Sequence, residues 1–119
     1  MSDHADLDPG GLARLHRLGG ADFVREMIDL FLVEAVQRLG EARAGESAHD
    51  WRAVGEAAHS IKSSAHNFGA SGLARAAGQI EMMAHSGEVE RIPALLDDLA
   101  RLTTLTCDWL RDQRASLPP

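Results

Sequence analysis

Apolar residues recur along most of the chain at spacings of three and four, which places them on one face of a helix. The clearest stripe consists of Val54, Ala58, Ile61, Ala65 and Phe68. Similar stripes run through residues 12–18, 21–44, 71–87 and 89–109. No alternating run of β-branched residues is long enough to suggest a strand. The pattern therefore predicts an all-α fold.

The first half of the chain predicts two helices. Asp8 and Pro9 suit the N-cap and first position of a short helix that ends at Gly19-Gly20. A longer helix would run from about Ala21 to Ala44 and stop at Gly45. Its apolar face would carry Phe23, Val24, Met27, Ile28, Phe31, Val36 and Leu39.

The second half predicts three more helices. The capping-box-like spacing of 47–50 would open a helix that runs to about Phe68, with Gly69 at its end. Ser71 would cap the next helix, and the last would begin near Val89. Short connections between long helices favour antiparallel neighbours. We therefore predict an up-down antiparallel four-helix bundle with a short additional N-terminal helix.

Length and charge narrow the class of protein. A chain of 119 residues forms one domain, 1–119, of which we expect about 8–113 to be ordered and the termini frayed. With a net charge of −6 and no basic stripe, the chain is not expected to bind nucleic acid. Residues 1–20 lack the apolar region of a signal peptide, and no apolar run is long enough to cross a membrane. We expect a cytoplasmic monomer.

The helix with the clearest stripe carries candidate chemistry on its outer face. At about 100° per residue, His59 lies roughly 140° from the middle of the stripe, Lys62 roughly 80° and Ser63 roughly 180°. An exposed imidazole is largely neutral near pH 7 and is then a nucleophile toward an activated phosphoryl group. Lys62 could balance the phosphoryl charge, and Ser63 could donate a hydrogen bond or leave room for a partner. A solvated surface histidine is the alternative.

A metal site and an ATP site are not expected. His59 and His66 share a face, but seven helical residues separate them by roughly 10 Å, too far to bind one ion. Cys107 is the single cysteine, so no cysteine-based metal site is expected either. The chain has no Walker A motif or kinase glycine loop. We therefore expect no cofactor and no kinase activity.

These residues also resemble a known family. The run from His59 to Ser64, followed by 67–70 (Asn-Phe-Gly-Ala), is similar to the phosphoacceptor helix of histidine-containing phosphotransfer (HPt) domains. The similarity extends to 7–9, 29–32 and Ile80-Glu81, which covers nearly the whole chain.

The resemblance implies a function. The chain would be a phosphorelay intermediate that accepts a phosphoryl group on His59 and exchanges it with the aspartate of response-regulator receiver domains in two-component signalling. A hybrid sensor histidine kinase would act upstream, and any Mg²⁺ would sit on the receiver domain. Ser63 departs from the family, which usually has glycine there. This departure favours the alternative, a helical interaction module without phosphotransfer.

Overall fold

The computed structural model describes residues 5–119, and most of these residues are helical. Its elements are α1 (Gly10–Ser47), α2 (Trp51–Asn67), α3 (Ser71–Ser86), a 3-10 turn η1 (Val89–Arg91) and α4 (Ile92–Ala115). The one β-type pairing found among them is an isolated bridge between Leu7 and Ala70. None of these helices is long and apolar enough to cross a membrane. The all-α prediction is confirmed.

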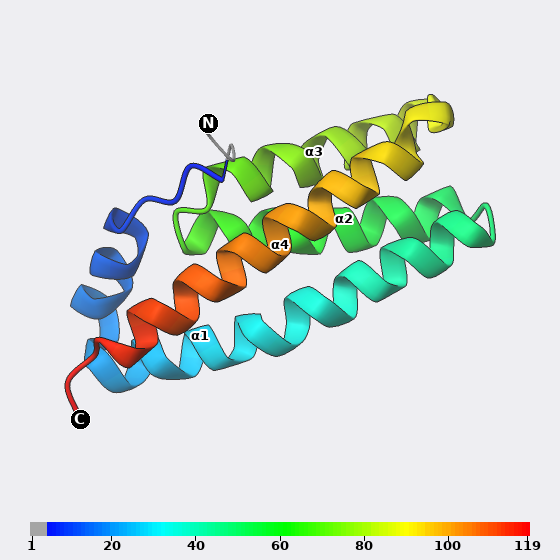
Figure 1. The fold of residues 1–119 in the computed structure, drawn as a ribbon. Coiled ribbons are helices and arrows are strands. Elements are labelled where there is room, and N and C mark those ends of the chain that lie inside the picture. Colours follow the sequence, from blue (N-terminus) through cyan, green and yellow to red (C-terminus); the bar gives the residue numbers. More distant parts are fainter. Residues whose placement is uncertain (1–4) are drawn as a thin grey trace.

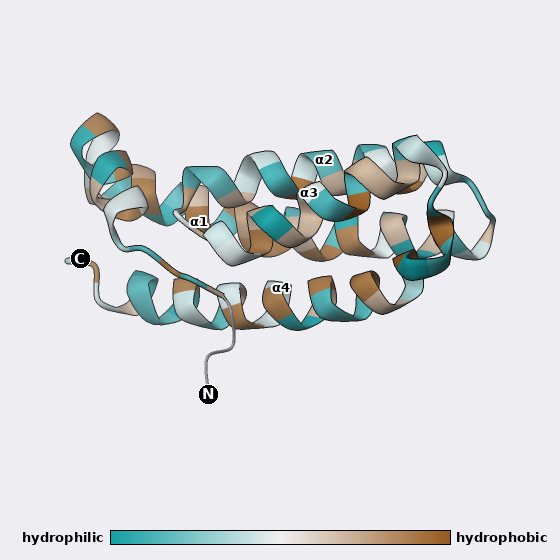
Figure 2. Ribbon diagram, turned by 90° about the horizontal axis from the view of Figure 1, so that it is seen from above, coloured by the Kyte–Doolittle hydropathy of each residue, from teal (hydrophilic) through white to brown (hydrophobic). Residues whose placement is uncertain are grey.

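The four long helices lie beside one another, and each turns back along the one before it (Figure 1). α2 packs against α1 on one side and α3 on the other, and α4 packs against the same two helices. Brown apolar and teal polar segments alternate along each helix in Figure 2, as expected for helices that bury one face.

The first element is a helix with a sharp break. Gly20 has φ 81° and ψ −175°, which lie outside the helical region and favour glycine. Figure 1 shows the blue first part of α1 at a steep angle to the rest. The short helix predicted before Gly20 thus forms the first segment of α1, ahead of the break.

The predicted end of α1 and start of α2 were wrong. Gly45 is buried inside α1, where a Cβ atom would lie 3.0 Å from Val54 Cγ2. The glycine therefore permits close packing of α1 on α2 and does not end the helix. Ser47 is the last residue of α1, and the cap of α2 is Asp50, whose carboxylate accepts a hydrogen bond from the Ala53 amide at 3.1 Å.

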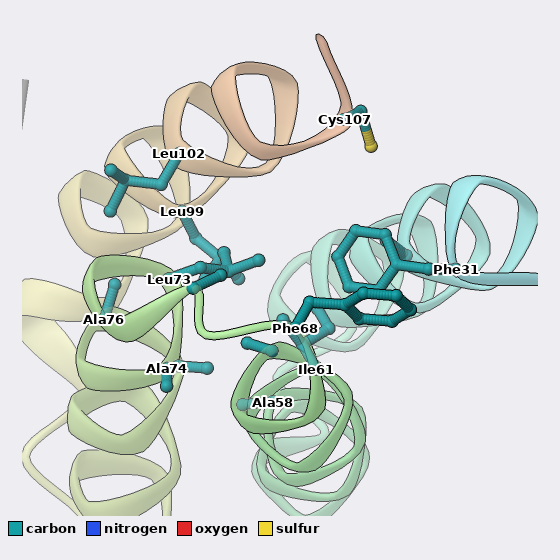
Figure 3. Packing of buried hydrophobic residues seen from close by; sticks show 14 of the residues in the cluster. Phe31, Ala58, Ile61, Phe68, Leu73, Ala74, Ala76, Leu99, Leu102 and Cys107 are labelled. Atoms are coloured by element: carbon teal, nitrogen blue, oxygen red, sulfur yellow. The ribbon is translucent and has the colours of Figure 1, made fainter. Parts of the chain in front are cut away.

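The core forms as the α2 stripe predicts. All five stripe residues are buried: Val54, Ala58, Ile61, Ala65 and Phe68. The rings of Phe31 and Phe68 meet edge to face at 5.1 Å, and Figure 3 shows them beside Ile61. Val36, predicted on the apolar face of α1, is 59% exposed, and its neighbour Ala35 is buried instead. Because the stripe buries one face of α2, the opposite face of the helix is exposed to solvent.

The N-terminal segment, residues 5–8, pairs with the turn between α2 and α3. The Asp8 amide donates to the Gly69 carbonyl at 3.0 Å. Asp6 and Ala5 in turn accept, through their carbonyls, from the amides of Ser71 and Gly72. The sequence led us to expect a frayed segment before residue 8. Instead, these residues hold the turn that ends the His59 helix.

Candidate functional site

His59 lies in the middle of α2 and points away from the core. Because Ala58 and Ile61 on either side are buried, the imidazole emerges on the outer face, and its side chain is 59% exposed. Lys62 lies one turn further along and is partly covered, at 32% exposed. The orientation expected for both residues is the one observed.

A carboxylate on α3 joins these two side chains. Glu81 Oε2 lies 2.7 Å from His59 Nδ1, and Glu81 Oε1 accepts a hydrogen bond from Lys62 Nζ at 2.5 Å. In the sequence, Lys62 precedes Glu81 by 19 residues and His59 precedes it by 22. The close packing of α2 on α3 brings the three side chains together. One carboxylate thus contacts both the candidate nucleophile and the candidate cation.

The electrostatics of this network determine which ring nitrogen is available. The hydrogen bond from Lys62 is the largest influence on Glu81 and lowers the pKa of its carboxyl group, with a further contribution from His59. An ionised carboxylate can only accept hydrogen bonds, so Nδ1 of His59 must be the donor. In the neutral ring the lone pair is then on Nε2.

Ser63 and His66 lie outside this network. Both side chains are exposed on α2, and Ser63 stands one turn beyond His59. His66 is in the last turn of α2. Within residues 5–119, no group of three or more possible ligands is arranged to hold a metal ion.

A groove runs between α2 and α3 next to the imidazole, and we call it the α2–α3 groove. It has a volume of about 870 Å³, and His59, Lys62 and Glu81 form part of its wall. Gly55, Gly78 and Ala84 also line it, as does Met82, whose side chain is 67% exposed.

Sequence reasoning missed the role of Glu81. The pair Ile80-Glu81 contributed to the family resemblance, but no function was assigned to it. Its position next to the buried Ile80 places Glu81 at the edge of the α3 stripe, which indicates a contact with a neighbouring helix. Identifying His59 as that contact requires the relative register of α2 and α3, which periodicity alone does not supply.

Fold and site together define a class of protein. A helical bundle that presents one exposed imidazole at mid-helix, with a lysine and a carboxylate beside it, has the arrangement of a histidine phosphotransfer domain. Such a domain carries phosphoryl groups in two-component signalling and is not a kinase.

Comparisons with known proteins agree with this class. A family model described as "Hpt domain" matches residues 26–109, so the chain belongs to the Hpt domain family. Among solved structures, the chain is similar to histidine-containing phosphotransfer protein B (HptB) from Pseudomonas aeruginosa PAO1. The two are 28% identical, with a TM-score of 0.89 over 95% of this chain and 97% of that one. A comparison with curated proteins gave no match. The resemblance seen in the sequence is confirmed.

Proposed function

We propose that the protein is a phosphorelay intermediate whose phosphoacceptor is Nε2 of His59. The observation that carries this proposal is the contact between His59 Nδ1 and Glu81. It assigns the hydrogen to Nδ1 and directs the nucleophilic lone pair outward, toward an approaching partner.

The proposed reaction needs no proton transfer at the imidazole. The Nε2 lone pair attacks the phosphorus of an aspartyl phosphate on a receiver domain. A nitrogen–phosphorus bond forms as the bond between phosphorus and the aspartyl oxygen breaks, and the carboxylate leaves with the electron pair. The ring keeps its Nδ1 hydrogen and becomes positively charged. The carboxylate of Glu81 at 2.7 Å stabilises that charge. The reverse step returns the phosphoryl group to the aspartate.

Lys62 supplies positive charge beside the transferred group. Phosphoryl transfer passes through a loose transition state with charge spread over the equatorial oxygens, so catalysis rests on positioning and charge balance. In the unphosphorylated protein Lys62 donates to Glu81 at 2.5 Å. We propose that its flexible side chain turns toward the phosphoryl oxygens once these arrive. Ser63, one turn past His59, provides access or a hydrogen bond.

The partners follow from the chemistry and from membership of the family. Hpt domains interact with receiver domains and kinases. We propose that the chain exchanges phosphate with the receiver domain of a response regulator and that a hybrid sensor histidine kinase acts upstream. Any Mg²⁺ used in the transfer belongs to the receiver domain. A cytoplasmic monomer that forms one domain remains our expectation.

A second candidate function is a helical interaction module without phosphotransfer. Ser63, in place of the usual glycine, is the feature that favours it. The side chain adds one hydroxymethyl group on an exposed face, which leaves the imidazole accessible. The phosphotransfer proposal therefore has the stronger support.

The test is to mix the chain with a phosphorylated receiver domain and to analyse the protein-bound phosphate. We expect acid-labile, base-stable phosphate on the wild-type chain. His59→Gln should accept none while keeping its helical content, because surface changes of this kind alter stability by only about 0.5 kcal/mol. His66→Gln, which removes another exposed histidine from the same helix, is the matched control and should accept phosphate normally. Phosphate on the His59→Gln variant would refute the assignment.

A further inference from the structure

The α2–α3 groove shares its wall with the candidate site. His59 and Glu81 line the groove at one side, and the space extends from them toward Trp51 and Met82. Reacting atoms in a transfer step must approach to roughly 3–3.5 Å. A protein that brings an aspartate this close to Nε2 of His59 therefore also covers the opening of the groove.

Two glycines add to the space in the groove. A Cβ atom on Gly55 would meet only Ala84 Cβ, at 3.6 Å, and one on Gly78 would meet only Lys62 Cδ, at 3.4 Å. Both contacts are compatible with ordinary packing, and neither glycine has a positive φ. Glycine is among the least favourable residues inside a helix. Since neither backbone nor packing requires these two glycines, their effect is to leave space beside His59.

The wall of this space combines the apolar side chains of Trp51, Met82 and Ala84 with the charged side chains of Arg52 and Glu56. Met82 is 67% exposed, and its thioether side chain can adapt to different shapes. Trp51 lines the groove and stacks on the ring of His49, at 5.5 Å between ring centres. An exposed apolar surface next to a polar reaction site is typical of a protein-binding surface.

We propose that the α2–α3 groove receives an apolar side chain of the receiver domain that exchanges phosphate with His59. This inference rests on the proposed function, because the occupant is the protein that supplies the aspartate. Gly55 and Met82 are then specificity-determining residues: Gly55 sets the depth of the groove and Met82 forms its wall. Receivers with a polar or charged residue at the matching position would bind more weakly, since that group would lose its water without gaining a partner.

The experiment uses a receiver domain chosen because its phosphorylated form transfers phosphate to the wild-type chain. Its dissociation constant is measured by calorimetry for the wild-type chain, Gly55→Ala, Gly55→Leu and Met82→Asp. We expect Gly55→Leu and Met82→Asp to weaken binding at least tenfold and Gly55→Ala to weaken it less, because one methyl group fills less of the space. Gly55→Ala should also raise the melting temperature, so it remains informative if the leucine variant does not fold.

Gly40 provides the matched control. It is an exposed helical glycine on α1, where an added Cβ atom would meet nothing within 4 Å, so Gly40→Leu should bind the receiver like wild type. Unchanged binding by both Gly55→Ala and Met82→Asp would overturn the inference. The inference would also be overturned if the wild-type chain formed a dimer that Gly55→Ala or Met82→Asp dissociated. The occupant of the groove would then be a second copy of the chain. Failure of the proposed function would give a different result from failure of this inference, because the wild-type chain would then accept no phosphate.

Discussion

At the scale of single residues, the activity proposed for His59 depends on a carboxylate that leaves Nε2 free. Glu81 contacts Nδ1 of the ring and Nζ of the lysine with its two oxygens. Its negative charge therefore has two uses in the proposed cycle. It fixes the hydrogen on Nδ1 before transfer and balances the positive ring afterwards.

The role of Glu81 can be tested by removing its charge and then its hydrogen bond. Glu81→Gln should slow phosphate acceptance about tenfold, since hydrogen bonds to charged groups are worth about 1.5–3 kcal/mol and neutral ones less. Glu81→Ala should be slower still and should lose the preference for hydrogen on Nδ1, measured by ¹⁵N resonances of the ring. Glu90→Gln, which removes an exposed carboxylate in η1 that does not line the α2–α3 groove, is the control and should resemble wild type. An unchanged ring tautomer in Glu81→Ala would contradict the assignment.

The second residue-scale prediction concerns Lys62. Lys62→Ala should slow transfer several-fold or more without abolishing it, because the imidazole remains the nucleophile and only charge balance is lost. Lys62→Arg retains the charge and should recover part of the rate. Transfer is measured at low ionic strength, where screening is weakest. Wild-type rates for Lys62→Ala under those conditions would show that the lysine has no charge role.

The sequence could identify His59 and Lys62 because both lie on one helix, where angular position follows from spacing alone. Glu81 could not be assigned in this way. Its contact with His59 depends on the position of α3 along the axis of α2. The close packing of small residues between the two helices determines that position. The buried faces of the two helices supply many of these residues, among them Ala57, Ala74 and Ala77.

At the scale of one helix, α2 both builds the core and presents the site. The five predicted stripe residues are all buried, and Ala57, which the prediction left out, is buried beside them. The apolar face of α1 was harder to predict. Ala35 and Val36 are adjacent and about 100° apart, so a wide stripe admits either residue. Burial of the smaller side chain indicates that close approach of the helices outweighs side-chain size at this position.

The prediction at this scale concerns Ser63, which is exposed one turn beyond His59. Ser63→Gly should transfer phosphate within a few-fold of wild type, at a cost in helix stability of less than about 1 kcal/mol. Ser63→Gln keeps a good helix former but adds bulk where a receiver must approach, so it should impair transfer strongly. Both are compared with wild type using one phosphorylated receiver, and folding is checked by circular dichroism. Rapid transfer to Ser63→Gln would mean that the receiver does not pass over this position.

At the scale of the whole molecule, ion pairs connect α1 to α4. Asp29 accepts from Arg114 through both carboxylate oxygens, at 2.7 and 2.9 Å. The hydrogen bond from Arg114 lowers the pKa of the Asp29 carboxyl below its ordinary value of 3.8. An acid with a lower pKa in the folded state stabilises the fold above its unfolded pKa. That stabilisation is lost as the pH falls through the folded value.

The molecule should therefore become less stable in acid, and part of this dependence should belong to Asp29. Asp29→Asn should have a slightly lower melting temperature at neutral pH and a flatter dependence of stability on pH below about 4. Urea unfolding measured between pH 3 and 6 provides the comparison. Asp22→Asn, which removes a carboxylate that is 93% exposed, should keep the wild-type profile. Identical slopes for wild type and Asp29→Asn would contradict the role of this pair.

The pairing of residues 5–8 with the α2–α3 turn has a consequence for hydrogen exchange. The first amides of a helix have no acceptor inside the helix and usually exchange quickly with solvent. In α3, however, the Ser71 and Gly72 amides donate to carbonyls of the N-terminal segment. Deuterium uptake at these two amides should be slow in the intact chain and fast after residues 1–8 are removed. The start of α3 thus reports whether the segment remains attached, about two helical turns beyond the candidate phosphoacceptor His59.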